Sequence, residues 1–187
     1  MWVTERDLTG ATELQVLINQ VKAANYVAGT TVGYLTQASV NAVAQAVTDA
    51  ETYLAGGSVT AEKSAEHQAA INAAVAALEV VMPEEGKFYV LKCSHEDRYV
   101  YVNNENKLNY TQSFDPNANA GKFVWQFEPV SDNKFKMKSV HTQSYMQTIT
   151  NGSHVTLGST GADVTLSMGA VAGTIKFEAG NTGIGIH

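Results

Sequence analysis

Apolar residues recur with helical spacing in three segments of the first 83 positions. The first stripe, Leu14, Leu17, Ile18 and Val21, has the spacing i, i+3, i+4, i+7 that marks one face of a helix. The other two stripes are Val40, Val43, Val47 and Leu54, and then Ile71, Val75 and Leu78. Each stripe is narrow, so a helix that carries one needs partners to bury it. We therefore expect three helices packed together.

Residues that start and stop helices separate the three stripes. Gly29 and Gly33 follow the first stripe, and Gly56-Gly57 follows the second. Thr60 is suited to cap the third helix at its N-terminus, with Glu62 in the first turn. Short connections make neighbouring helices antiparallel. These residues predict an up-down-up three-helix bundle that ends near Pro83.

Beyond Pro83 the period of the pattern changes from about 3.6 to 2, which is typical of strands. Phe135, Met137 and Ser139 alternate with three lysines, and Tyr99 and Tyr101 alternate with Val100 and Val102. Residues 123–127 alternate in the same way, with Phe123, Trp125 and Phe127 on one side. We expect this part to be all β, with Trp125 in its core rather than at its surface.

Similar segments open three units of the β part, at Phe88, Phe135 and Ile175. The spacings are 47 and 40 residues, and the loop 113–120 accounts for the excess of the first unit. Three units of about 40 residues, each with four short strands, would close a β-trefoil barrel. Because the third unit reaches His187 after about two strands, the predicted fold is a truncated β-trefoil-like domain.

Composition favours two domains, which we place at residues 1–83 and 84–187. The first range holds 18 of the 24 alanines but only 4 of the 16 aromatic residues. A change this sharp is unusual within one core. The predicted fold class is therefore a two-domain chain, an antiparallel three-helix bundle followed by the β domain.

Charge and hydropathy exclude several kinds of partner. The formal charge of −6 divides into −5 for residues 1–83 and −1 for the rest. The nearest approach to a basic patch is Lys134, Lys136 and Lys138, which we interpret as a solvated strand face, so we expect no nucleic-acid partner. No stretch approaches the roughly 20 apolar residues of a membrane-spanning helix, and we expect no membrane insertion. Any secretion signal would lie outside this sequence.

Residues that could carry chemistry do not form a recognisable constellation. Cys93 is the single cysteine and is interpreted as structural, although His95 follows it closely. The five histidines lack metal-ligand spacing. Asp115, Asn117 and Asn119 imitate the start of a calcium loop, but Ala120 and Gln126 stand where its Gly and Glu belong. We expect no cofactor, no metal and no catalytic activity.

Two family resemblances extend these inferences. Residues 13–82 resemble the FIVAR-type helical module, found beside catalytic domains in secreted and surface proteins of gut and other bacteria. The segments that carry this resemblance are 14–18, 43–47 and 69–78. Residues 87–187 resemble the ricin-type β-trefoil, through the segments 125–130, 133–137 and 144–147.

The ricin-type resemblance implies where a sugar would bind. The family's sugar-binding acid falls on Tyr101 in the first repeat and on Gln147 in the second, so neither position supplies a carboxylate. Its stacking aromatic falls on Tyr110 and on Leu157, and Phe123 replaces the glutamine of its Gln-any-Trp signature. Tyr101, Tyr110 and Gln147 are the candidate carbohydrate-binding residues.

Together the resemblances imply a non-catalytic accessory fragment of a larger exported bacterial glycoside hydrolase. Its partner would be a carbohydrate, and its location extracellular, periplasmic or on the cell surface. The alternative is a structural spacer or protein-interaction module that holds neighbouring domains of the same polypeptide and binds no sugar. The missing carboxylates favour this alternative.

Overall fold

The computed structural model describes residues 9–94, 96–115, 120–150, 153–180 and 185–186. The chain divides into two compact units, Met1–Val81 and Met82–His187. The boundary expected from composition lay after residue 83. Each unit has its own hydrophobic core.

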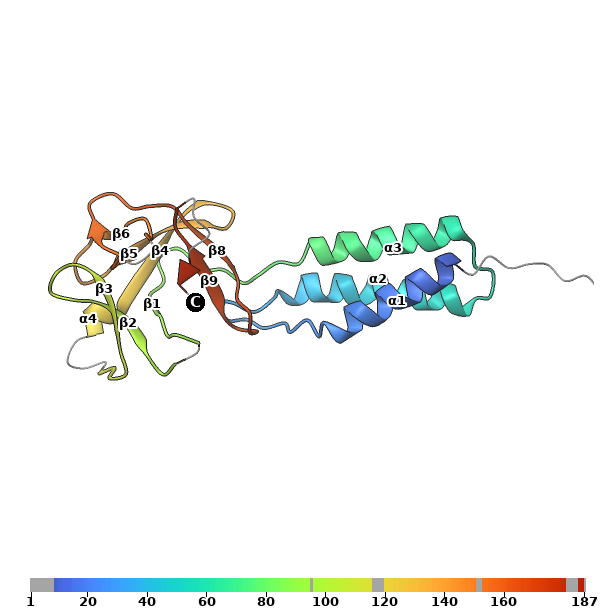
Figure 1. Ribbon diagram of the computed structural model, residues 1–187, viewed down its shortest axis with the longest axis horizontal. Coiled ribbons are helices and arrows are strands. Elements are labelled where there is room, and N and C mark those ends of the chain that lie inside the picture. Colours follow the sequence, from blue (N-terminus) through green and yellow to red (C-terminus); the bar gives the residue numbers. More distant parts are fainter. Residues whose placement is uncertain (1–8, 95, 116–119, 151–152, 181–184, 187) are drawn as a thin grey trace, which may run out of the picture. The chain divides into compact units, whose positions relative to one another are not determined.

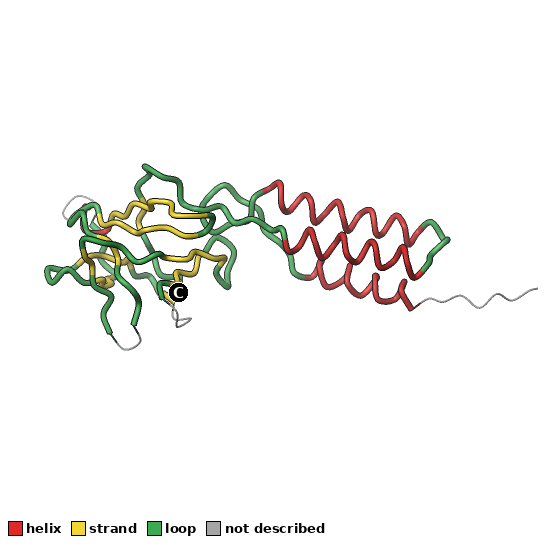
Figure 2. The backbone as a smooth tube through the Cα atoms, turned by 90° about the horizontal axis from the view of Figure 1, so that it is seen from above, coloured by secondary structure: helices red, strands yellow, loops and turns green. Residues whose placement is uncertain are grey.

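The first unit consists of three helices packed together, as the apolar stripes predicted. They are α1 (Thr9–Ala23), α2 (Gln37–Ala55) and α3 (Ala61–Ala76). Successive helices run in opposite directions (Figures 1 and 2). Lys22 of α1 forms an ion pair with Glu51 of α2, at 2.5 Å between Nζ and Oε1.

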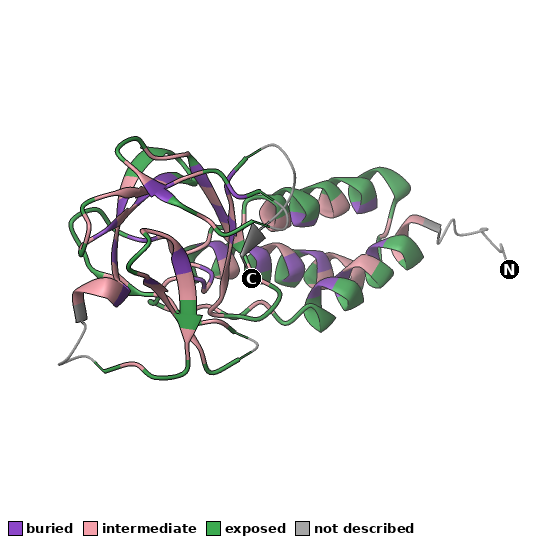
Figure 3. Cartoon of the chain, turned by 60° about the vertical axis from the view of Figure 1, so that its left-hand side comes forward, coloured by how far each residue is buried: buried purple, intermediate pink, exposed green. Residues whose placement is uncertain are grey.

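The predicted stripes supply the core of this helical unit. Leu14 and Ile18 of α1 and Ile71 of α3 are fully buried, and buried residues recur along the inner sides of the helices (Figure 3). The buried apolar cluster contains Leu14, Ile18, Val21, Val43, Val47, Ala50 and Ile71. Half-buried Leu17, Leu54, Val75 and Leu78 pack around it. Burial of these narrow stripes is what holds the three helices together.

Threonine side chains cap two of the helices. Thr60 accepts a hydrogen bond from the Lys63 backbone N–H at 3.3 Å, which confirms the predicted cap of α3. At the start of α2 the Thr36 side chain accepts a hydrogen bond from the Ser39 backbone N–H in the same way. This cap was not predicted from the sequence. Gly57, with φ of 76°, follows the end of α2 in the left-handed region that suits glycine.

The last helix ends several residues before the unit does. Beyond Ala76 the chain passes beside the connection between α1 and α2. The backbone N–H of Thr36 donates to the Glu79 carbonyl, and the backbone N–H of Val81 donates to the Tyr34 carbonyl, both at 2.8 Å. Leu35 and Val80 form an antiparallel bridge. These bonds satisfy backbone groups that a longer helix would have satisfied internally.

In the described part of the second unit the chain forms ten short strands and one helical turn. The strands are β1 (Tyr89–Val90), β2 (Tyr99–Val102), β3 (Leu108–Thr111), β4 (Val124–Ser131), β5 (Lys134–Ser139), β6 (Tyr145–Met146), β7 (Leu157–Gly158), β8 (Val164–Met168), β9 (Ile175–Glu178) and β10 (Gly185–Ile186). The helical turn α4 spans Ala120–Phe123. The β character of this part is thereby confirmed.

Antiparallel pairing joins the strands of the β unit. The larger sheet has the order β1-β4-β5-β8-β9-β10, and β6 pairs with both β5 and β7. Strands β2 and β3 form a separate hairpin. The prediction that Phe123 lies on a strand is wrong, because β4 begins at Val124 and Phe123 ends α4. Its buried ring contacts Tyr101 and Phe114 instead of continuing the strand face.

Large apolar side chains fill the inside of this unit. Trp125, Phe127 and Met137 are almost completely buried, and the prediction of a core Trp125 is confirmed. The Trp125 indole N–H points to the Val100 carbonyl at 3.5 Å, so strand β4 contacts the β2–β3 hairpin. Further buried members are Val102, Leu108, Phe135, Met146, Ile149, Leu157, Val164, Leu166, Phe177 and Ala179.

The face of β5 that carries Lys134, Lys136 and Lys138 is less exposed to solvent than the sequence suggested. Lys134 is exposed, but the Lys138 side chain is only 22% exposed. Its ammonium lies 3.8 Å from a Glu128 carboxylate oxygen and 5.5 Å from the centre of the Tyr145 ring. One of the three lysines of β5 is therefore paired with a carboxylate and packed beside an aromatic ring.

Replacement of a core leucine tests the helical packing. Leu14→Ala removes a fully buried side chain of α1 and should lower the free energy of unfolding of the helical unit by about 3 kcal/mol. Val16→Ala, on the same helix but 49% exposed, should change it by less than about 0.5 kcal/mol. Urea denaturation followed by circular dichroism at 222 nm measures both, and equal effects would contradict the packing described.

Candidate functional site

The β2–β3 hairpin positions two of the three candidate residues. Its antiparallel register places Val100 opposite Tyr110 and Tyr101 opposite Asn109. Side chains alternate between the two faces of a strand, and paired residues share a face. Tyr101 therefore lies on one face of the hairpin with Tyr99, whereas Tyr110 lies on the other face with Val100.

The face that carries Tyr101 is covered by aromatic rings. The Tyr101 ring lies 5.4 Å from that of Phe123, and Phe123 meets Phe114 edge to face at 5.1 Å. Phe114 also stacks on Tyr99 at 4.9 Å. We call these four rings the hairpin cluster. Through Phe114 it packs the start of the loop 113–120 against the hairpin, and the Tyr101 ring is part of this packing.

Tyr110 lies on the face of the hairpin that packs into the core through Val102 and Leu108, but its own ring, near the end of β3, is exposed to solvent. Tyr110 is 59% exposed, and the guanidinium carbon of Arg98 lies 4.7 Å from its ring centre. Arg98 in turn holds Glu96, with 2.6 Å between Nε and Oε2. The side chains of Arg98 and Glu96 are 33% and 53% exposed. An exposed aromatic ring, a planar cation and a carboxylate thus lie in sequence along one edge of the hairpin.

Gln147 follows β6 and makes structural hydrogen bonds. Its side-chain amide donates to the carbonyls of Tyr145, at 3.1 Å, and of Thr160. Its backbone N–H donates to the Thr156 carbonyl at 3.0 Å. The amide also lies against Gly158, where a Cβ atom would come within 3.0 Å of it. Gln147 therefore joins the β6–β7 hairpin to the loop that follows.

The structure does not gather the three candidates into one pocket. Tyr101 and Tyr110 face opposite ways, and Gln147 is bonded within the second hairpin. Leu157, the second position expected for a stacking aromatic, is buried in the core. Tyr110 is the candidate whose side chain is most available to a ligand. Its contact with Arg98, and through Arg98 with Glu96, was not identified from the sequence.

Two further ion pairs involve residues near the hairpin. Asp97 pairs with Lys92 at 2.6 Å, and Glu105 pairs with Lys107 at 2.9 Å in the turn between β2 and β3. The hydrogen bond that Lys92 donates to Asp97 raises the pKa of Lys92, and the hydrogen bond that Glu105 accepts from Lys107 lowers the pKa of Glu105. Each cation is thereby matched by a neighbouring carboxylate.

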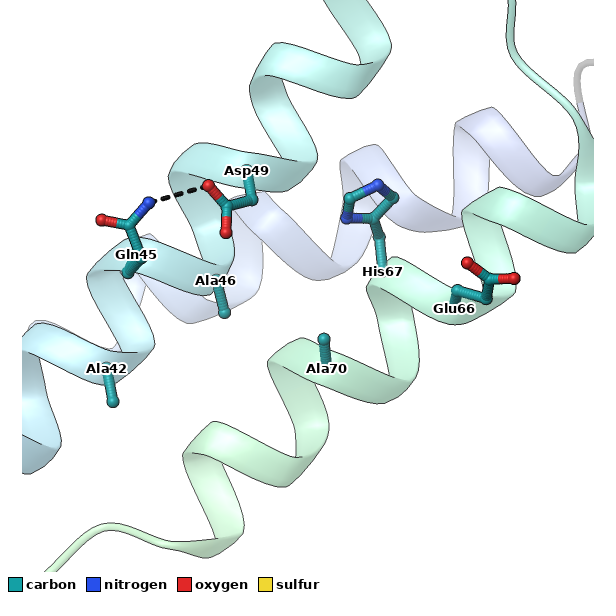
Figure 4. Close-up of a pocket in the computed structure, with 7 residues that line it drawn as sticks. All are labelled: Ala42, Gln45, Ala46, Asp49, Glu66, His67 and Ala70. Carbon is teal, nitrogen blue, oxygen red and sulfur yellow. Dashed lines mark hydrogen bonds between the residues drawn. The ribbon is translucent and has the colours of Figure 1, made fainter.

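A separate hollow lies between α2 and α3 in the helical unit (Figure 4). Its volume is about 600 Å³, and its lining residues are Ala42, Gln45, Ala46, Asp49, Glu66, His67 and Ala70. Gln45 donates to Asp49 at 2.7 Å, and the His67 ring stacks on Tyr53 at 4.7 Å. The alanines form a shallow contact surface, with the carboxylates of Asp49 and Glu66 beside it. The lining residues do not form a catalytic arrangement.

The remaining sequence candidates do not form a reactive site in the described part of the chain. Cys93 is half-buried. His95, Asn117 and Asn119 lie outside the described residues, whereas Asp115 is exposed. Over the described ranges, no three His, Cys, Asp or Glu side chains come together in a way that could hold a metal. Within the same ranges, no helix has the length and apolar character to cross a membrane.

Loss of Phe114 tests the hairpin cluster. Phe114→Ala removes two ring contacts and should lower the free energy of unfolding of the β unit by about 2 kcal/mol. Gln112→Ala, at an exposed position of the same segment, should change it by less than about 0.5 kcal/mol. Trp125 fluorescence during urea denaturation, in a Trp2→Phe background, reports both. If Phe114→Ala matches Gln112→Ala, the cluster does not stabilise the unit.

Comparison with known proteins gave no relative on which to base a function. A scan against protein-family models and a search of curated proteins both returned no match to this chain. The functional interpretation therefore rests on the side chains of the hairpin and on the two resemblances that the sequence itself suggests.

Proposed function

We propose that this chain is a non-catalytic accessory segment of a larger exported bacterial protein, a glycoside hydrolase or a related polysaccharide-processing enzyme. In this proposal the β unit binds carbohydrate, with Tyr110 as the surface on which a sugar ring stacks. The observation that carries it is the 59% exposed Tyr110 ring, held on a paired strand.

Tyr110 has the physical properties of a sugar platform. Aromatic faces pack against the C–H groups of pyranose rings, and a tyrosine has few rotatable bonds to immobilise on binding. Its backbone is paired with Val100, and the Arg98 guanidinium lies over one face of the ring, so the ring is held before a ligand arrives and a sugar would stack on the opposite face. A pre-organised surface loses less entropy when it binds.

The proposal includes a β-trefoil architecture for the β unit, and the strand order supports it. Strands β1 and β4 pair, and the β2–β3 hairpin lies between them in sequence. Strands β5 and β8 also pair, and the β6–β7 hairpin lies between them in sequence. The two hairpins meet where Lys107 bridges Thr156. Repetition of one four-strand arrangement is what a trefoil requires.

The helical unit would serve as a spacer or docking element beside the catalytic part of the parent protein. Its resemblance to the FIVAR-type module supports this role. Three antiparallel helices around one apolar core form a unit that keeps its length when neighbouring domains move.

A second function, that of a spacer or protein-interaction module without sugar binding, has its own support. Tyr101 is engaged in the hairpin cluster and Gln147 in backbone hydrogen bonds, so both positions that correspond to the family's acid have structural roles. The hollow between α2 and α3 would be a contact surface for a neighbouring domain in this alternative.

Replacement of Tyr110 separates the two functions. The full chain is first screened by isothermal titration against plant and host oligosaccharides, where we expect millimolar or tighter binding. Tyr110→Ala should weaken that binding at least about tenfold, because it removes the stacking surface. Its circular dichroism spectrum should match that of the unmodified chain.

Phe88→Ala is the matched control, because Phe88 is also an exposed aromatic residue of the β unit, 63% exposed. It should leave the affinity unchanged. Equal binding by Tyr110→Ala and the unmodified chain would refute Tyr110 as the platform. Absence of binding by the folded chain to every oligosaccharide would favour the spacer function.

A further inference from the structure

The hollow between α2 and α3 has the shape and the charge to receive a helix. We infer that it binds a partner helix that presents small apolar side chains to the hollow and lysine or arginine side chains beside them. The inference rests on the docking role proposed for the helical unit, and it names the kind of partner that would dock there.

The lining of the hollow comes from one side of each helix. On α2 it runs from Ala42 to Asp49 with the spacing i, i+3, i+4, i+7, and on α3 it runs from Glu66 to Ala70. In Figure 4 the side chains of Ala46 and Ala70 turn toward the space between the two helices. The two helices thus form the sides of a groove that runs along both of them.

The small side chains of this groove let another helix approach closely. Packed helices lie about 8–10 Å apart, and the distance depends on the side chains at the contact. Ala42 and Ala70 are exposed, and Ala46 is half-buried. The hollow has a volume of about 600 Å³, and its lining on α2 covers two helical turns, or about 11 Å. Side chains from two turns of a docked helix would therefore lie against it.

One wall of the groove is fixed before any partner arrives. The His67 ring stacks on Tyr53, with 4.7 Å between the ring centres. The Tyr53 hydroxyl accepts a hydrogen bond from the Thr60 backbone N–H at 2.7 Å and donates to the Thr60 carbonyl at 3.1 Å. A wall that is already ordered loses less entropy on binding.

The charge around the groove favours a basic partner. Asp49 is exposed, and no lysine or arginine of the described chain forms an ion pair with it. Lys22 and Lys63, the lysines in the described part of the helical unit, are each paired with a glutamate already. Residues 1–83 carry a formal charge of −5. A helix with lysine or arginine beside its contact row supplies the missing positive charge.

The same charge disfavours other occupants. A second copy of this chain would bring an equally acidic helical unit to the groove, and like charges repel. An acidic peptide would be repelled in the same way. A small molecule would remain largely uncovered in a shallow hollow, whereas ligand pockets enclose most of the ligand surface.

Isothermal titration of the full chain with three stapled helical peptides tests the inference. The first peptide has a contact row of alanine and leucine with lysine on both sides of it. The second has the same row with glutamate in place of lysine, and the third keeps the lysines but has serine in the row. We expect the first peptide alone to bind, with millimolar or tighter affinity that falls as salt is added.

Two pairs of variants locate the binding. Ala70→Tyr fills the hollow and should weaken binding of the first peptide at least about tenfold, whereas Ala69→Tyr, at an exposed position outside the lining, should not change it. Asp49→Asn should weaken binding about threefold, because it removes an exposed ion pair. Glu13→Gln removes the same charge from an exposed position of α1 and should have no effect. Unaltered circular dichroism spectra show that the variants fold.

Four results would overturn the inference. The two tyrosine variants could weaken binding equally, or the two charge variants could do so, and either result would place the peptide outside the hollow. Tighter binding of the glutamate peptide would reverse the charge of the partner. Self-association of the chain that Ala70→Tyr abolishes, measured by sedimentation, would make a second copy the occupant.

A comparison with sugar binding separates this inference from the proposed carbohydrate function. If the folded chain binds none of the peptides but binds an oligosaccharide through Tyr110, the inference fails and the carbohydrate function stands. If the lysine peptide binds in the hollow and no oligosaccharide binds, the inference stands and the protein-interaction function is favoured.

Discussion

The register of the β2–β3 hairpin decides which of its side chains pack and which remain available. With Val100 opposite Tyr110, Tyr99 and Tyr101 face the rings of Phe114 and Phe123, and Tyr110 faces solvent beside Arg98. A shift of one residue would exchange the two faces along a whole strand. Val102 and Leu108 pair on the face that packs into the core, so a shift would turn one of these two buried side chains away from that core.

The two units obtain stability from different side chains. The helical unit brings narrow stripes of Leu, Ile and Val together, with alanines over much of its remaining surface. The β unit depends on a few large residues, above all Trp125 and Phe127, whose burial joins the sheet to the hairpin. This difference between the two cores accounts for the change from alanine-rich to aromatic-rich composition near residue 83.

Features that depend on local periodicity could be predicted from the sequence. The three helices, the Thr60 cap and the buried Trp125 follow from spacing and residue type alone. The extended segment after Ala76 and the turn at Phe123 could not be predicted, because contacts with distant residues determine both. The site depends still more on such contacts. Neither the opposite orientation of Tyr101 and Tyr110 nor the proximity of Arg98 to Tyr110 is visible before the register is known.

The central claim of the proposal is that a sugar binds to the exposed ring of Tyr110. Titration of the ¹⁵N-labelled chain with the oligosaccharide that binds best, followed by amide chemical shifts, tests this claim most directly. The account predicts that the largest shifts fall on residues 96–100 and 108–111. Shifts confined to the β6–β7 hairpin or to the hollow between α2 and α3, or no shifts with any oligosaccharide, would contradict it.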